Sequence, residues 1–252
     1  MKTQMQRPMA MIRALVITLA IIAHFACEHQ ESTYQPMLDI HGVLRNDYEI
    51  QRVILSRTYS MDEPEYFDLE DAQIILSGCG LCDTMIYHGH SPQGGVFETW
   101  PFIPEPRTTY QVIAYADGYD TLFGQTTTPG NFEIIQPSWS DTVDLNDTIV
   151  FSASEGAREY QIACVNASQQ YFYWVVWPSA EPESLFKVPL SIFSTYVDEG
   201  DYEFMVFACD SNYFDYEYLF SSEKYPQCGI TGGIGLFGSM WVKFVSVYIV
   251  QP

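Results

Sequence analysis

The fold class of this chain follows from one short stretch, Tyr110-Gln-Val-Ile-Ala-Tyr115, and from the Asp117-Gly118 turn behind it. Every second residue from Tyr110 onward faces the same side of an extended strand, and those residues are apolar. Asp-Gly is a strong turn signal, and Pro129-Gly130 supplies another further along. Short strands between such turns favour an antiparallel β-sandwich over a parallel α/β sheet.

The same pattern of short strands between turns recurs on both sides of this stretch. Further strands are expected at residues 52–57, 72–76, 148–152, 159–164, 171–177 and 201–208. The pattern restarts near Ile135-Gln-Pro137. We therefore predict an all-β protein with two immunoglobulin- or fibronectin-like sandwiches, one over residues 37–135 and one over residues 136–252.

The C-terminal region has a different character. Residues 211–222 fit a strand or a short helix, because the strand period and the helical period each bring aromatic residues onto one face. The glycine-rich run Gly229–Gly238 precedes a last strand, Met240–Val250. We interpret this run as backbone packed closely at a turn or bulge and assign it to the second sandwich.

The N-terminus has the features of an export signal. An apolar run of 13 residues, Ala14–Ala26, follows three basic residues and ends at Cys27. Such a run is too short to span a bilayer and fits a signal-peptide core. A small residue before a cysteine is typical of bacterial lipoproteins, although His24 stands where Leu is usual. We predict a lipoprotein signal at 1–26, lipidation of Cys27 and a tether at 27–36; an ordinary secretory signal and an uncleaved anchor are the alternatives.

Charge limits the partners that are expected. The whole chain has a formal net charge of −21, and residues 1–26 hold three of its 11 basic residues and none of its 32 acidic ones. The mature chain therefore has a formal net charge of −24. Such a chain repels phosphate backbones, so nucleic acid is not an expected partner. The contents of hydrophobic and aromatic residues, 47% and 15%, suffice for packed cores.

Four features in order carry a family resemblance. They are the leader with Cys27-Glu28, the strands Leu38–Leu44 and Val53–Arg57, the segment Asp71–Leu76, and the tail Gly232–Gly238. Together they resemble the outer-membrane lipoproteins of Gram-negative bacteria that carry domain of unknown function 4249. The Gly78-Cys-Gly-Leu-Cys82 segment departs from that pattern. The resemblance implies two β-rich modules, a place at the outer membrane, and work beside large import receptors.

The remaining cysteines are candidates for covalent or metal chemistry. Cys79 and Cys82 are expected to form a local disulfide; reduced thiols, a redox motif, or zinc bound with His88 and His90 are alternatives. An odd number of cysteines remains after Cys27, so at least one thiol is free or pairs with another chain. Cys164 and Cys209 are expected to bridge two strands of the second module, and a Cys209–Cys228 bridge is the alternative.

No motif of an enzyme is present. The sequence lacks a Gly-x-Ser-x-Gly elbow, a His-Glu-x-x-His pair and nucleotide-binding loops, so we expect a non-enzymatic protein without a cofactor. We expect a binding module for an envelope protein such as an import receptor. A glycan-binding lipoprotein is the second hypothesis, with Tyr171, Tyr173 and Trp177 as ligand-facing rings if they are not core residues. A hydrolase without a local motif is the third.

Overall fold

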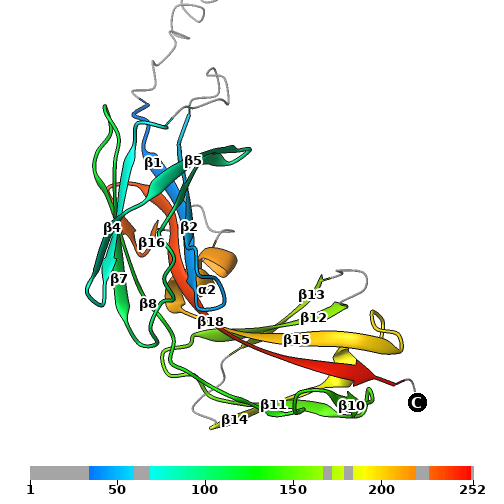
Figure 1. The fold of residues 1–252 in the computed structure, drawn as a ribbon. Coiled ribbons are helices and arrows are strands. Elements are labelled where there is room, and N and C mark those ends of the chain that lie inside the picture. Colours follow the sequence, from blue (N-terminus) through cyan, green and yellow to red (C-terminus); the bar gives the residue numbers. More distant parts are fainter. Residues whose placement is uncertain (1–33, 60–68, 167–171, 179–183, 220–226, 251–252) are drawn as a thin grey trace, which may run out of the picture. The chain divides into compact units, whose positions relative to one another are not determined.

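The computed structural model describes residues 34–59, 69–166, 172–178, 184–219 and 227–250, with only the backbone described at 172–178. Residues 36–252 belong to one compact unit. Its strands form a ten-stranded, a five-stranded and a three-stranded sheet. Figure 1 shows the elements along the chain. The prediction of an all-β protein is confirmed, since within these ranges the only α-helix is α2 (Ser211–Leu219).

The N-terminal sandwich places part of the ten-stranded sheet against the five-stranded sheet. Its first layer contains β1 (Leu38–Arg45), β2 (Arg52–Arg57), β5 (Ile86–Ser91), β6 (Gly94–Glu98) and the first half of β18 (Ile234–Ile249). Its second layer contains β3 (Gln73–Gly78), β4 (Leu81–Thr84), β7 (Thr109–Tyr115), β8 (Leu122–Thr127) and β17 (Ile230–Thr231). Alternate side chains of both layers meet in one core, for example Ile40, Leu55, Ile74 and Val112.

The C-terminal sandwich has the same two-layer construction. Its larger layer contains β10 (Asp141–Val143), β12 (Glu159–Asn166), β13 (Phe172–Pro178), β15 (Gly200–Cys209) and the second half of β18. Its smaller layer contains β9 (Ile134–Gln136), β11 (Thr148–Ser152) and β14 (Leu185–Pro189), and a 3₁₀ turn, η1 (Leu190–Phe193), follows β14.

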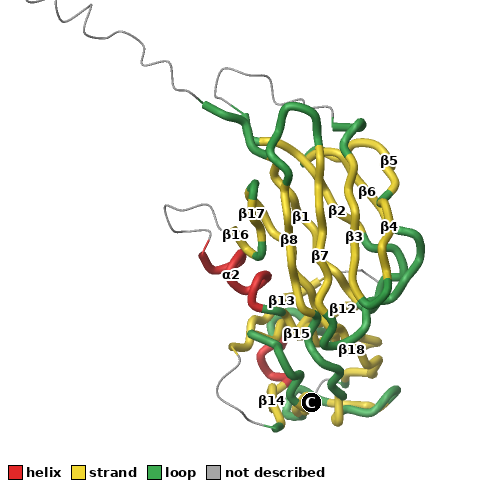
Figure 2. The backbone as a smooth tube through the Cα atoms, turned by 90° about the vertical axis from the view of Figure 1, so that its left-hand side faces the viewer, coloured by secondary structure: helices red, strands yellow, loops and turns green. Residues whose placement is uncertain are grey.

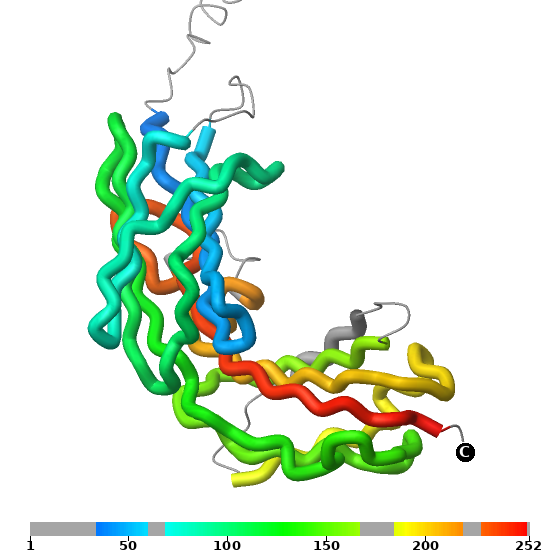
Figure 3. Tube along the Cα trace, viewed as in Figure 1, coloured from blue at the N-terminus to red at the C-terminus, as the bar shows by residue number. Residues whose placement is uncertain are grey.

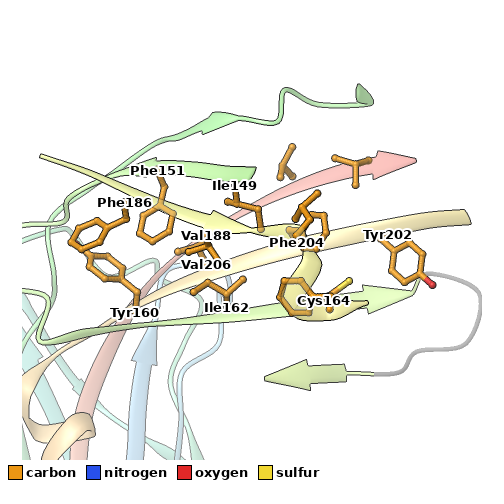
Figure 4. Packing of buried hydrophobic residues seen from close by; sticks show 14 of the residues in the cluster. Ile149, Phe151, Tyr160, Ile162, Cys164, Phe186, Val188, Tyr202, Phe204 and Val206 are labelled. Carbon is orange, nitrogen blue, oxygen red and sulfur yellow. The ribbon is translucent and has the colours of Figure 1, made fainter. Parts of the chain in front are cut away.

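Aromatic rings fill the C-terminal core. Phe151 stacks on Phe186 at 5.3 Å, and the Tyr160 ring lies 4.7 Å from that of Phe186. Figure 4 shows these rings between strands of the two layers, with Phe204 and Tyr202 further along. Burying such large rings supplies much of the hydrophobic driving force for this sandwich.

One strand connects the two sandwiches. β18 pairs in parallel with β1 through residues 234–240 and in antiparallel with β15 through residues 240–249. Figure 3 lets the reader follow this strand in red from one sandwich into the other. The glycine-rich segment before and within β18 thus belongs to the first sandwich, where β17 pairs with β8 and Phe237 joins the core.

This arrangement corrects one expectation from the sequence and decides a second question that the sequence leaves open. The modules are not consecutive stretches, because residues 227–240 complete the N-terminal sandwich instead of extending the C-terminal one. Gly235 explains why glycine is needed there: it has φ of +112°, and a side-chain carbon would overlap the carbonyl oxygen of Ile40 on β1. Residues 211–219, left open between strand and helix, form α2, which lies beside β16 (Gln227–Cys228) in Figure 2.

Candidate functional site

Several predicted site residues lie outside the described part of the chain. The proposed lipidation site, Cys27, and the proposed ligand-facing Tyr171 are among them. Tyr173 and Trp177 are described only as backbone positions of β13, where they pair with Cys164 and Tyr160 of β12. Their roles therefore stay predictions. No helix among the described residues has the length and apolar character needed to cross a bilayer.

The Gly78-Cys-Gly-Leu-Cys82 segment forms the hairpin between β3 and β4. Cys79 and Gly80 both have positive φ angles, 49° and 76°, as the two central residues of a type I′ turn require. Both thiols are free and exposed, so the expected local disulfide is not formed in this structure. The thiol of Cys79 interacts with the carboxylate of Glu105, which raises the pKa of this thiol.

The alternative zinc set does not assemble. His88 lies 3.5 Å from the carboxylate of Glu98 on β6, and His90 packs edge-on against Tyr87 at 5.7 Å. Among the residues whose placement is described, no group of three or more His, Cys, Asp or Glu side chains is arranged to hold a metal ion. The hairpin thiols and these histidines are thus separate features.

The predicted Cys164–Cys209 bridge is wrong. Cys164 pairs with Phe204, whereas Cys209 pairs with Glu159, five residues further along the same ladder. At about 3.3 Å per residue this separates the two Cα atoms by roughly 16 Å, far beyond the ~7 Å limit for a disulfide. The thiols also face opposite sides of the sheet, since each belongs to a different hydrophobic cluster.

All three C-terminal thiols are buried and free. The pKa of Cys164 is raised to about 12 and that of Cys228 to about 11, in both cases chiefly because burial disfavours the thiolate. The alternative Cys209–Cys228 pair does not form either, because these residues lie opposite Met240 and Leu236, four positions apart on β18. They act as small apolar residues of the cores.

A buried polar network lies where β8, α2 and β18 meet. Asp210 caps α2: its Oδ1 accepts the backbone N–H of Tyr213 at 2.8 Å. Its Oδ2 accepts the hydroxyl groups of Thr126 and Ser239. Burial raises the pKa of Asp210, and these hydrogen bonds oppose the rise. Because every carboxylate oxygen has a partner, we interpret this network as a structural joint between the sandwiches.

A second buried carboxylate lies beneath α2. Glu159, at the start of β12, is fully buried. Its Oε1 accepts a hydrogen bond of 3.1 Å from Nε2 of Gln161, but its Oε2 has no hydrogen-bond partner among the described residues. Burial is the main cause that raises its pKa; hydrogen bonding with Gln161 and Tyr218 opposes the rise, and the negative charge of Glu217 on α2 adds a smaller increase. The side chain is closed off from solvent, so it offers no open binding site.

The best candidate for binding is the outer face of the larger layer in the C-terminal sandwich. Four odd-numbered residues of β18, Trp241, Val245, Val247 and Ile249, enter the core. Even-numbered ones point outward, and Phe244 and Tyr248 remain 48% and 38% exposed. Trp139, 60% exposed, lies edge-on to Phe244 with ring centroids 5.8 Å apart.

Carboxylates flank these rings. On β15, Glu203 pairs with Ser246 and Asp201 pairs with Tyr248. Tyr248 donates a hydrogen bond of 3.1 Å to Glu199. We call this surface the aromatic–acidic face and define it by a set of five residues. They are Trp139, Asp201, Glu203, Phe244 and Tyr248.

A shallow hollow belongs to the same face. It encloses ≈ 270 Å³ and is lined by both carboxylates, with Ser140 and Ser246 beside them. The backbone N–H of Ser140 donates to the carbonyl of Ser246 at 2.7 Å, which fixes the Trp139 loop on β18. Ring faces beside carboxylates can bind cations or polar groups that carry apolar stems.

Sequence reasoning missed this face. Alternation within residues 240–250 is a signal that one side of the last strand is exposed, but it does not show which loop lies over that side. Trp139 is about 100 positions away in the chain, and it is placed there by the Ser140–Ser246 hydrogen bond and by the pairing of β10 with β18 directly after it.

Comparison with known proteins gives a family and distant structural likenesses. The family described as Domain of unknown function (DUF4249) matches residues 23–246. No curated protein matches the chain.

Solved structures with fibronectin domains are similar at low identity. Fibronectin(III)-like modules of Clostridium thermocellum CbhA share 10% identity, with 85% of this chain and 95% of that chain covered and a TM-score of 0.27. A two-domain fibronectin type-III segment of chicken tenascin shares 11% sequence identity, with a TM-score of 0.23. The match covers 70% of this chain and 91% of the tenascin segment. The FN1–FN3 domains of chicken CNTN1 share 10% sequence identity with this chain, with a TM-score of 0.23. The match covers 85% of this chain and 65% of the CNTN1 chain.

Proposed function

We propose, starting from the finding that this chain belongs to the DUF4249 family, that it is a non-enzymatic lipoprotein of the outer membrane that binds another envelope protein. The aromatic–acidic face is the observation that carries the binding role. Trp139 and Phe244 are large apolar rings that stay exposed although they touch each other. Clusters of exposed rings on one sheet face are typical of protein-binding surfaces.

The anchor is argued from the sequence. A basic start, an apolar run and Ala26 before Cys27 form the signal expected for lipidation. The first strand begins at Leu38, so only about ten residues separate the acylated cysteine from the fold. A short tether of this kind raises the local concentration of the module for a partner in the same membrane, to the order of millimolar. An import receptor of the outer membrane is the partner class that we propose.

Two measurements test this proposal. Cys27→Ser should abolish incorporation of labelled palmitate and release the protein from the envelope fraction. A photo-crosslinking amino acid at Phe244 should give an adduct with an envelope protein in native membranes. The same substitution at Phe123 is the matched control, because this residue on β8 is 49% exposed and Phe244 is 48% exposed. Unchanged palmitate labelling, or no adduct from Phe244, would refute the anchored binding role.

Glycan binding is the second candidate function. The exposed indole of Trp139 supports it, because an indole face can stack on a sugar ring, and the carboxylates Asp201 and Glu203 can accept hydroxyl groups. A saccharide that perturbs the Trp139 indole, with no protein adduct at Phe244, would favour this function over the first.

A further inference from the structure

The aromatic–acidic face joins three features that select one kind of ligand. Exposed ring faces come from Trp139, Phe244 and Tyr248. Carboxylates come from β15, where Asp201 and Glu203 line the hollow beside these rings. Both kinds of group attract a cation, the rings through their negative faces and the carboxylates through full charges.

Positive charge is scarce around these carboxylates. Lys243 is the basic residue nearest to the face along β18, and its Nζ lies 3.5 Å from the Glu133 carboxylate on the side away from Phe244. Glu203 is only partly exposed, and this partial burial raises the pKa of its carboxylate. Among the described residues, no basic side chain forms an ion pair with Asp201 or Glu203.

The same sheet already accepts one guanidinium from within the chain. Arg45 lies 5.2 Å from the ring centre of Phe207 and 4.5 Å from that of Tyr48. Its guanidinium also forms hydrogen bonds of 2.9 and 2.6 Å with the carboxylate of Asp47. Phe207 pairs with Val242, two residues before Phe244 on β18. Aromatic rings plus a carboxylate thus bind an arginine on this surface next to the aromatic–acidic face.

We propose that the aromatic–acidic face docks a basic segment of a partner protein, with an arginine or lysine side chain over Phe244 and Trp139 and its charge toward Asp201 and Glu203. Charge complementarity supports this occupant: the chain has 11 basic against 32 acidic residues, so an acidic partner would be repelled. Arginine fits best, because its planar group stacks on rings and pairs with a carboxylate at once. The inference rests on the proposed binding function and names the chemistry of the partner.

The test uses the mature full-length protein and a short synthetic peptide of alternating glycine and arginine. We expect saturable binding that perturbs the Trp139 indole signal in NMR spectra and weakens as salt is raised. A peptide with citrulline in place of arginine keeps the shape but lacks the charge, and it should not bind. Equal binding of both peptides would overturn the proposal, as would binding of a maltooligosaccharide with no binding of the arginine peptide.

Matched variants locate the site. Trp139→Ala and Asp201→Asn should each weaken peptide binding about three- to tenfold. Their controls are Trp100→Ala, at a residue that is 64% exposed in the N-terminal sandwich, and Asp117→Asn in the exposed turn after β7; both should leave binding unchanged. All four residues lie at the surface, and thermal unfolding checks that each variant folds. Equal losses in a variant and its control would refute the assignment of the face.

The outcomes separate this inference from the proposed function. If the arginine peptide binds as described but Phe244 gives no envelope adduct in native membranes, the docking chemistry stands and the envelope-binding function fails. If the adduct forms while Trp139→Ala and Asp201→Asn leave peptide binding unchanged, the function stands and the basic-segment inference fails.

Discussion

The side chain of Asn46 takes the place of a strand beside Val242. Its Nδ2 donates to the Val242 carbonyl at 3.0 Å, and its Oδ1 accepts the Val242 N–H at 2.5 Å. β1 ends one residue earlier, at Arg45, which pairs with Met240. Asn46 therefore extends the hydrogen bonding of β18 by one step at the place where this strand leaves the first sandwich for the second.

Asn46→Ala should lower the free energy of unfolding by about 1–3 kcal/mol. The change removes two hydrogen bonds, each with a net value of roughly 0.5–1.5 kcal/mol, and leaves a partly buried N–H and carbonyl without partners. Urea denaturation measures the effect. Asn146→Ala, in an exposed turn, is the control and should stay within about 0.5 kcal/mol of the unmodified protein. Equal effects of both changes would show that the two hydrogen bonds between Asn46 and Val242 do not stabilise the fold.

Gly235→Ala should be among the most damaging single changes. Its φ of +112° strains any other residue, and the added carbon would collide with Ile40 of β1. We expect the free energy of unfolding to fall by more than about 3 kcal/mol, or the variant to give little soluble protein. Gly80→Ala separates the two causes, because Gly80 also has a positive φ, +76°, but has no atom within 4 Å of the added carbon. That variant should lose only about 1 kcal/mol. Similar losses in the two variants would contradict the close approach of the strands.

Asp39 should make the stability of the protein depend on pH. Burial raises its pKa from 3.8 to about 6, and a hydrogen bond with Ser56 opposes the rise. Because the folded pKa lies above the unfolded one, the favourable contribution is complete below about pH 4 and is lost as pH rises through 6. The side chain of Asp39→Asn cannot ionise, so this variant should not lose that stability. Its free energy of unfolding should rise by about 1–3 kcal/mol relative to that of the unmodified protein between pH 4 and pH 7. Urea denaturation at both values gives the difference, and a difference that does not change with pH would contradict the assignment.

The cysteines should divide into two classes by reactivity. In the native protein, iodoacetamide should modify the exposed Cys79 and Cys82 but not the buried Cys164 and Cys209; after denaturation it should modify all four. Peptide mapping by mass spectrometry measures this. Because the carboxylate of Glu105 raises the pKa of Cys79, Glu105→Gln should speed alkylation of Cys79 near pH 8 and leave Cys82 unchanged. A native peptide containing Cys164 disulfide-bonded to Cys209 would contradict the strand register.

Some elements of the fold could be predicted because their signal is local. The strand predicted at residues 52–57 is β2, and the strand predicted at residues 148–152 is β11. The sequence does not decide between a helix and a strand at α2, because its aromatic residues fit the periods of both structures. A local signal was present, since Asp210 directly before Ser211 is a favourable helix cap.

The candidate site could not be predicted for a physical reason. An alternating pattern shows which residues share a face but not which strand is the neighbour. Cys164 ends one predicted strand and Cys209 directly follows another of the same module, yet the register places them on opposite faces and five positions apart. In the same way, Trp139 meets Phe244 only because its loop is bonded to β18.

The sequence by itself determined that this protein is built of short β-strands and tight turns, because backbone preference and side-chain alternation act over a few neighbouring residues. Only the tertiary structure decided that the glycine-rich segment returns to the first sandwich, so that Asp39 pairs with Ile234 across nearly the whole chain. It also decided which rings stay exposed. Both outcomes depend on burying the two cores at once, and this burial requires contacts between residues far apart in sequence.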